Sequence, residues 1–152
     1  MKKRILIVDD NEMVLQTMLM ALSENEQYIV EATSNPLDAY DLAALRDYDL
    51  LILDVNMVPM RGDMLYLSVA VDSRIDLKKR KQPKLLLVSG YYTSQELKEK
   101  VELIGGCDYM EKPFDSGTLS MKVASILWKD RGPGAISGDG LGIVSPAADT
   151  GN

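Results

Sequence analysis

The stretch Ile5-Leu6-Ile7-Val8-Asp9-Asp10 places four branched apolar side chains directly before two acids. An apolar run of this length is typical of a strand buried on both faces, as strands of parallel sheets are. Residues 50–54 and 85–89 repeat the arrangement and end in an aspartate and a serine. Because parallel strands end at the same rim of a sheet, the sequence predicts that these polar side chains meet at one place.

Apolar runs and helical patterns alternate five times along the chain, always with the strand first. The strands are expected at residues 5–8, 28–32, 50–55, 84–89 and 107–110, and the helices at residues 11–23, 36–46, 62–70, 93–104 and 116–129. This order predicts an α/β fold, a doubly wound parallel sheet of five strands with helices on both faces. Right-handed crossovers favour the flavodoxin-like strand order 2-1-3-4-5, in which the first and third strands are neighbours.

The composition restricts the class of protein. A chain of 152 residues with 46% hydrophobic residues supports one domain with its own core. Its net charge of −6 disfavours direct nucleic-acid binding, and no apolar stretch approaches the roughly 20 residues that membrane insertion requires. One cysteine, Cys107, excludes an internal disulfide and favours a cytoplasmic location. Histidine is absent, so the chain cannot itself carry a phosphohistidine.

Two segments depart from the alternating pattern. From residue 131 the sequence is rich in glycine and small polar residues, which predicts a domain over residues 1–130 and a flexible tail or truncated linker over residues 131–152. A partner-binding peptide is the alternative for that tail. The basic run Lys78-Lys79-Arg80-Lys81 precedes the fourth strand, so we expect a solvated loop at the end of the sheet opposite the acids. A docking patch for an acidic partner is the alternative for this run.

The acids at the strand ends form a candidate metal site. Carboxylates held close together repel one another, and a hard divalent cation such as Mg²⁺ relieves the repulsion with oxygen ligands. We expect Asp10 and Asp54 to bind Mg²⁺ directly and Asp9 through water. The backbone carbonyl of Asn56, just after Asp54, is expected to complete the protein ligands. The alternative is that Asp9 and Asp10 only cap the following helix, whose dipole favours negative charge at its start.

A lysine, Lys112, follows the fifth strand and precedes Pro113. An aspartate carboxylate can attack a phosphoryl group and hold it as an acyl phosphate, and catalysis of that transfer consists mainly of positioning and charge. Asp54 is the expected acceptor, while the Lys112 ammonium and the Ser89 hydroxyl are expected to bind phosphoryl oxygens. A cis bond before Pro113 is expected to direct the lysine inward.

The set Asp9-Asp10, Asp54, Ser89 and Lys112-Pro113-Phe114 resembles the receiver domain of bacterial two-component response regulators. The resemblance implies that Asp54 accepts phosphate from a histidine kinase or a histidine phosphotransfer protein, with Mg²⁺ as cofactor. It also implies a switch in which Ser89 moves toward the phosphoryl group and Tyr109 turns into the vacated space. The switch would alter the face formed by the fourth helix, the fifth strand and the fifth helix, where a downstream protein or a second copy of the chain binds.

Asn56 and Tyr91 stand at the two positions that, in receiver domains, set how fast water removes the phosphate. A bulky Tyr91 is expected to shield the acyl phosphate and lengthen its lifetime. The chain departs from the family in the loop after the acceptor, where Pro59 comes one residue late before Gly62, and this departure is expected to change the rate of phosphotransfer. For Tyr109 the alternative to a switch is a half-buried core aromatic.

The resemblance predicts a signalling module rather than an enzyme, with only its own phosphorylation and dephosphorylation to catalyse. The enzyme alternative is a phosphatase resembling the haloacid dehalogenase class, which uses the same kinds of residue around Mg²⁺. That class places a second aspartate two positions after its nucleophile, where this chain has Asn56, which cannot donate a carboxyl proton. Further alternatives are a scaffold that does not accept phosphate, and a receiver module cut from a hybrid histidine kinase.

Overall fold

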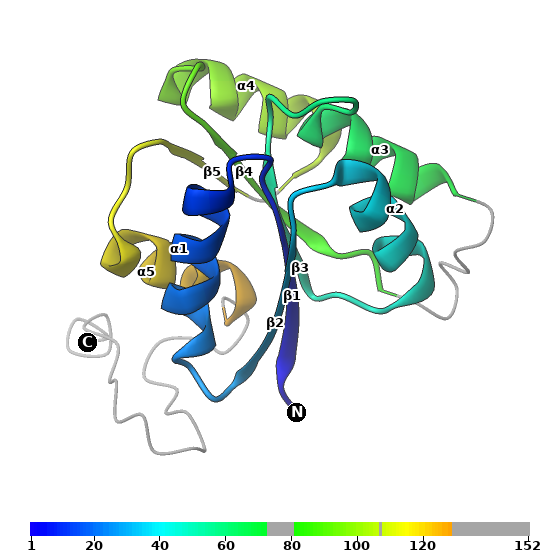
Figure 1. Cartoon of the computed structure of the whole chain (residues 1–152). Helices are drawn as coiled ribbons and strands as arrows, with labels where there is room; N and C mark the ends of the chain where they lie inside the picture. Colours follow the sequence, from blue (N-terminus) through cyan, green and yellow to red (C-terminus); the bar gives the residue numbers. More distant parts are fainter. Residues whose placement is uncertain (73–80, 107, 129–152) are drawn as a thin grey trace, which may run out of the picture.

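The computed structural model describes residues 1–72, 81–106 and 108–128 and contains one five-stranded parallel sheet (Figure 1). Its strand order, β2-β1-β3-β4-β5, confirms the predicted flavodoxin-like arrangement. The strands are β1 (Lys3–Val8), β2 (Tyr28–Thr33), β3 (Leu50–Asp54), β4 (Lys84–Ser89) and β5 (Asp108–Glu111). The helices are α1 (Glu12–Ser23), α2 (Pro36–Leu45), α3 (Gly62–Val71), α4 (Ser94–Ile104) and α5 (Ser116–Leu127).

The helices cover the sheet in two layers, with α1 and α5 on one face and α2, α3 and α4 on the other (Figure 1). Successive side chains of a strand point to opposite faces, so each buried strand contributes to both layers. Ile7 of β1 packs in the core under α1 and α5, and its neighbour Val8 packs in the core under α2, α3 and α4. Burial on both faces explains why these strands are continuous apolar runs in the sequence.

Local capping interactions set the helix ends. Asn35 accepts a hydrogen bond from the backbone N–H of Leu37 at the start of α2. Thr93 and Glu96 form a capping box at the start of α4. The same helix ends at Gly105, whose φ of 72° is the left-handed conformation that glycine adopts most readily.

Several predicted boundaries differ from the structure by one or two residues. The strand β3 ends at Asp54, the last residue paired with β4, rather than at residue 55. The helix α2 ends at Leu45 rather than at residue 46, and β5 runs on to Glu111. Cys107, most of the basic run (residues 78–80) and the tail (residues 131–152) lie outside the described residues.

The strand register aligns the polar residues that follow the strands. Val8 of β1 pairs with Leu53 of β3, so the residues that follow them, Asp9 and Asp54, lie side by side at the rim. On the other side of β3, Asp54 pairs with Val88, the residue before Ser89. No helix among residues 1–72, 81–106 and 108–128 is long and apolar enough to cross a membrane.

Candidate functional site

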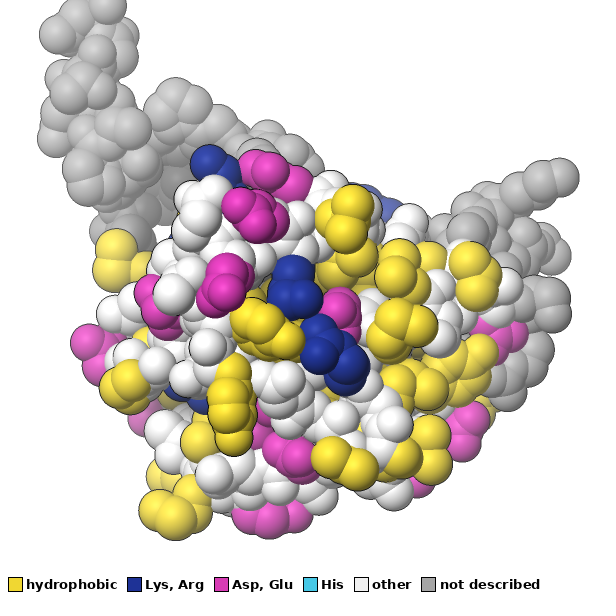
Figure 2. Space-filling view, turned by 90° about the horizontal axis from the view of Figure 1, so that it is seen from above, with side chains coloured by type: hydrophobic (Ala, Val, Ile, Leu, Met, Phe, Trp, Pro, Cys, Tyr) yellow, Lys and Arg dark blue, Asp and Glu magenta, His cyan; other side chains and the backbone are white. Residues whose placement is uncertain are grey.

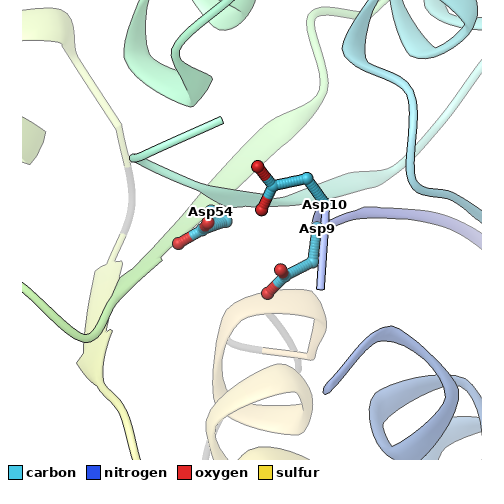
Figure 3. Close-up of side chains that lie close together, drawn as sticks. All are labelled: Asp9, Asp10 and Asp54. Atoms are coloured by element: carbon cyan, nitrogen blue, oxygen red, sulfur yellow. The ribbon is translucent and has the colours of Figure 1, made fainter. Parts of the chain in front are cut away.

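Three aspartates gather where β1 and β3 end (Figure 3). Asp9 and Asp10 follow β1 and Asp54 closes β3, and one carboxylate oxygen from each lies within 4.8 Å of the others. Asp9 is fully buried, Asp54 is 5% exposed and Asp10 is exposed. The structure thus brings together the three acids that the sequence predicted as metal ligands.

The donors in this group are suited to a hard divalent cation. All three side chains offer oxygen, which Mg²⁺ prefers, and the exposed Asp10 leaves one side open to the water ligands that Mg²⁺ usually retains. Asn56, whose backbone carbonyl is the remaining predicted ligand, lies two residues after Asp54 in the loop between β3 and α3. The residues present therefore fit Mg²⁺.

Lys112 joins two of the acids. Its ammonium nitrogen lies 2.5 Å from Asp9 Oδ2 and 3.3 Å from Asp54 Oδ1. The backbone holds this lysine in place, because its N–H donates to the carbonyl oxygen of Ser89 at 2.8 Å. The Lys112–Pro113 peptide bond is cis, as the sequence predicts.

Burial makes the charge of Asp54 costly. Removal from water raises the pKa of Asp54 to about 6, since a buried carboxylate loses hydration that its neutral form needs less. The ammonium of Lys112 lowers this pKa, and the negative charge of Asp9 raises it further. In the absence of a metal ion, Asp54 is therefore partly protonated at slightly acidic pH.

The alternative role of Asp9 and Asp10 as helix caps is wrong. The cap of α1 is Asn11, whose side chain accepts hydrogen bonds from the backbone N–H groups of Met13 and Val14. Asp9 instead accepts the backbone N–H of Asn11 itself, at 2.9 Å. Asparagine is a preferred N-cap residue, so the sequence held a signal for a cap at Asn11. The predicted helix began at residue 11, one residue before the observed start of α1 at Glu12.

The hydroxyl of Ser89 is fully buried at the end of β4 and is surrounded by donors. It accepts the backbone N–H of Tyr91 at 3.0 Å and that of Tyr92 at 3.4 Å. The side-chain amide of Asn56 also donates to it, at 3.4 Å. The predicted tuning residue Asn56 and the predicted switch residue Ser89 are therefore in direct contact.

The other two predicted residues, Tyr91 and Tyr109, are aromatic and differ in exposure. The Tyr91 side chain is 84% exposed and lines an open hollow with Asn56. Tyr109 on β5 is half-buried and packs against the core under α2, α3 and α4. The Lys122 ammonium from α5 lies 5.9 Å from the centre of the Tyr109 ring, beside a groove lined by residues of α4, β5 and α5.

Two features of the loop between β3 and α3 were missed in the sequence. A Cβ at Gly62 would lie 2.1 Å from the backbone oxygen of Asp54, so only glycine permits this packing. Arg61, the residue before Gly62, donates a hydrogen bond to the hydroxyl of Tyr92 in the loop between β4 and α4. A glycine at the start of a helix was the signal for the first feature, whereas the second is a long-range contact that local patterns do not encode.

Comparisons with known proteins identify a family and relatives to which this chain is similar. Residues 5–124 match the model of the response regulator receiver domain family. The cell cycle response regulator CtrA of Brucella ovis is 30% identical over 131 residues, which are 85% of this chain and 52% of that protein. The chain spans about half the length of the curated relatives it matches.

Solved structures have the same fold. The chemotaxis protein CheY4 of Vibrio cholerae is 27% identical with a TM-score of 0.71, over 84% of this chain and 100% of that one. A CheY-like receiver domain protein of Methanospirillum hungatei is 26% identical with a TM-score of 0.71, over 85% of this chain and 96% of that one.

Proposed function

This chain belongs to the response regulator receiver domain family, and on that premise we propose that Asp54 is the residue that accepts the phosphoryl group. One observation carries the proposal: the Asp54 carboxylate closes a buried strand within 4.8 Å of two other acids and 3.3 Å from Lys112. A nucleophile needs this combination of cationic and metal-binding groups, because phosphoryl transfer depends on positioning and on neutralising charge. The family match favours a receiver domain over the phosphatase alternative.

The proposed reaction is an in-line displacement. A carboxylate oxygen of Asp54 attacks the phosphorus of a phosphohistidine on a histidine kinase or a histidine phosphotransfer protein. The phosphohistidine ring carries a proton on the nitrogen that is not phosphorylated. The new P–O bond forms as the P–N bond breaks, the bonding electron pair stays on the ring nitrogen, and neutral imidazole leaves. The product is an acyl phosphate on Asp54. Lys112, which is within reach of Asp54, is proposed to bind one phosphoryl oxygen, and Ser89 another.

Asp9, Asp10 and Asp54, with the backbone carbonyl of Asn56, are proposed to hold Mg²⁺. When bound, the ion supplies positive charge that offsets both the acids and the phosphoryl oxygens. The burial of Asp9 and the raised pKa of Asp54 support this assignment, because three acids this close are costly without a cation.

Phosphorylation is proposed to act as a two-state switch. Ser89 moves toward the phosphoryl group, Tyr109 turns inward, and the face of α4, β5 and α5 changes shape. The half-buried position of Tyr109 beside that groove supports the idea. The partner of the altered face is proposed to be a downstream protein or a second copy of the chain, without direct nucleic-acid binding by this domain. The proposal includes a cytoplasmic location, where the single Cys107 would stay reduced.

The receiver domain is proposed to extend over residues 1–130, with residues 131–152 as a tail or linker. The family match over residues 5–124 and the end of α5 at Leu127 support this division. Because this chain matches only about half the length of the curated relatives, any output function of the whole protein stays a proposal.

The experiment compares the wild-type chain with Asp54→Asn after incubation with acetyl phosphate and Mg²⁺. We expect the wild type to gain a single phosphoryl group in intact-mass spectra and Asp54→Asn to gain none. Hydroxylamine, which cleaves acyl phosphates, should remove the group. Absence of the adduct from wild type, or its presence on Asp54→Asn, would refute Asp54 as acceptor. Sustained release of phosphate from a small phosphate ester would favour a phosphatase instead.

A further inference from the structure

Arg61 ties two loops of the site together. Its guanidinium forms a fork with the Asp63 carboxylate, with Nε 3.1 Å from Oδ1 and Nη2 3.2 Å from Oδ2. The remaining terminal nitrogen, Nη1, donates to the Tyr92 hydroxyl at 3.2 Å. The fork fixes the plane of the guanidinium, so the third hydrogen bond has a defined direction.

Tyr92 is held from a second side as well. The Lys100 ammonium of α4 lies 4.6 Å from the centre of the Tyr92 ring, and the Arg61 guanidinium carbon lies 5.9 Å from it. The ring is also partly buried against the core under α2, α3 and α4. Figure 2, which looks at the molecule from above the view of Figure 1, shows basic side chains near the middle of this face, with hydrophobic side chains next to them.

The backbone of Tyr92 is bound to the proposed switch residue. Its N–H donates to the Ser89 hydroxyl at 3.4 Å, next to the donation from Tyr91 at 3.0 Å. A Ser89 hydroxyl that turns toward a phosphoryl group on Asp54 must leave these donors or carry the loop with it. In the first case the two N–H groups lose their acceptor, and in the second the segment from Gly90 to Tyr92 moves, while Arg61 holds the side chain at its end.

We infer that Arg61 is a positioning residue that holds the loop after β4 in its unphosphorylated arrangement through the hydroxyl of Tyr92. This inference rests on the proposed function of Asp54 and adds a regulatory contact between Arg61 and Tyr92. The contact is made in the present arrangement and is weakened when the loop moves. Its removal therefore shifts the equilibrium toward the phosphorylated form, and ligands that select that form bind more tightly.

The test measures the affinity of beryllofluoride, a mimic of the phosphoryl group, at saturating Mg²⁺ by calorimetry. Tyr92→Phe removes only the hydroxyl, and Arg61→Ala removes the donor. We expect each variant to bind beryllofluoride about fivefold more tightly than wild type, as the loss of one partly exposed charged hydrogen bond predicts. The double variant should bind no more tightly than either single variant, because both break the same contact.

The matched control is Tyr48→Phe, which removes a tyrosine hydroxyl that is bonded to Glu31 outside the loops of the site. We expect its affinity for beryllofluoride to equal that of wild type. Unfolding followed by fluorescence of Trp128, the one tryptophan, checks that each variant folds. Equal or weaker binding by Tyr92→Phe, or additive effects in the double variant, would overturn the inference. If wild type binds no beryllofluoride, the proposed function fails instead.

A spectroscopic readout separates positioning from a purely structural role. In Tyr92→Phe without ligand, the amide resonances of Gly90 and Tyr91 should shift part of the way toward their positions in beryllofluoride-bound wild type. A structural role alone would lower stability without moving these resonances along that line, and that outcome would also overturn the inference.

Discussion

At the scale of single residues, the burial of Asp54 disfavours the charged form of its carboxylate. Asp54 is 5% exposed as a residue and lies beside Asp9, which is fully buried. Lys112 offsets part of that cost, with its ammonium shared between the two acids. The same arrangement favours the binding of a cation, because a cation supplies positive charge that the three acids lack.

The raised pKa of Asp54 gives a pH-dependent prediction for the metal-free protein. With a pKa of about 6 folded and about 4 unfolded, this acid holds its proton more tightly in the folded state. Its contribution to stability is complete below pH 4 and is lost as pH rises through 6. We therefore expect Asp54→Asn to be more stable than wild type at pH 7.5, by about 1 to 3 kcal/mol, with little difference at pH 4.

Urea unfolding at the two pH values, followed through Trp128 fluorescence, measures this difference. Saturating Mg²⁺ should stabilise the wild type more than Asp54→Asn, because one ligand is lost in the variant. A gap between the two proteins that is the same at pH 4 and pH 7.5 would contradict the linkage.

Gly62 is expected to be essential for the geometry around Asp54. Replacement by alanine puts a Cβ 2.1 Å from the Asp54 backbone oxygen, so the loop or the strand end must shift. We expect Gly62→Ala to lower the free energy of unfolding by about 1 to 3 kcal/mol and to slow phosphorylation by acetyl phosphate. The matched control is Gly90→Ala, where the new Cβ would meet Lys112 at an ordinary 3.7 Å. Comparable losses in both variants would show that the close approach is not the cause.

Tyr91 is expected to protect the acyl phosphate from water. Its ring lines the hollow that also contains Asn56, beside the end of β3. We expect Tyr91→Ala to shorten the half-life of the phosphorylated protein severalfold, measured by the decay of the mass adduct after removal of acetyl phosphate. Tyr91→Phe keeps the bulk and serves as the control. Equal half-lives for wild type and Tyr91→Ala would rule out shielding.

At the scale of elements, the sequence predicted most of what positions the site. Buried strands are continuous apolar runs here, so the strand ends and the acids after them were recognisable. The capping box of Thr93 and Glu96 and the terminal Gly105 are likewise local patterns. The strand order followed from crossover rules, which made the meeting of Asp9 and Asp54 predictable.

The remainder depends on contacts between distant residues. The Arg61–Tyr92 hydrogen bond joins residues 31 apart, and the Asn56–Ser89 hydrogen bond joins residues 33 apart. Neither leaves a periodic or local pattern in one sequence. The approach of Gly62 to Asp54 is similar, since a glycine at a helix start has several explanations until the packing is seen.

The start of α4 provides a prediction at this scale. Thr93 accepts the N–H of Glu96, and Glu96 accepts the N–H of Thr93, directly after the loop that follows Ser89. We expect Thr93→Ala to weaken α4 by about 1 kcal/mol, seen as faster amide hydrogen exchange confined to that helix. The corresponding change in α1, Asn11→Ala, should accelerate exchange there and leave α4 unaffected. Acceleration across the whole chain in Thr93→Ala would indicate global rather than local weakening.

At the scale of the whole molecule, the proposed response to phosphorylation is confined to one side of the sheet. The site lies at the rim shared by both layers, but the residues proposed to respond to phosphate belong to β4, β5 and the helices beside them. Ser89 and Lys112 are directly connected, because the Lys112 N–H donates to the Ser89 carbonyl. A shift at the end of β4 therefore reaches β5 through a backbone hydrogen bond, whereas β2 lies at the other edge of the sheet.

This division predicts where phosphorylation changes local stability. Beryllofluoride with Mg²⁺ should alter amide hydrogen exchange in the loop after β4 and in α4, β5 and the first turn of α5. Exchange in α2 and β2 should stay within error, because their contacts to the responding elements are indirect. The control is Asp54→Asn under the same conditions, which should show no change beyond that caused by Mg²⁺ alone. Protection spread evenly over all the helices would mean that ligand binding only stabilises the whole fold, since a local switch redistributes stability toward one side of the sheet.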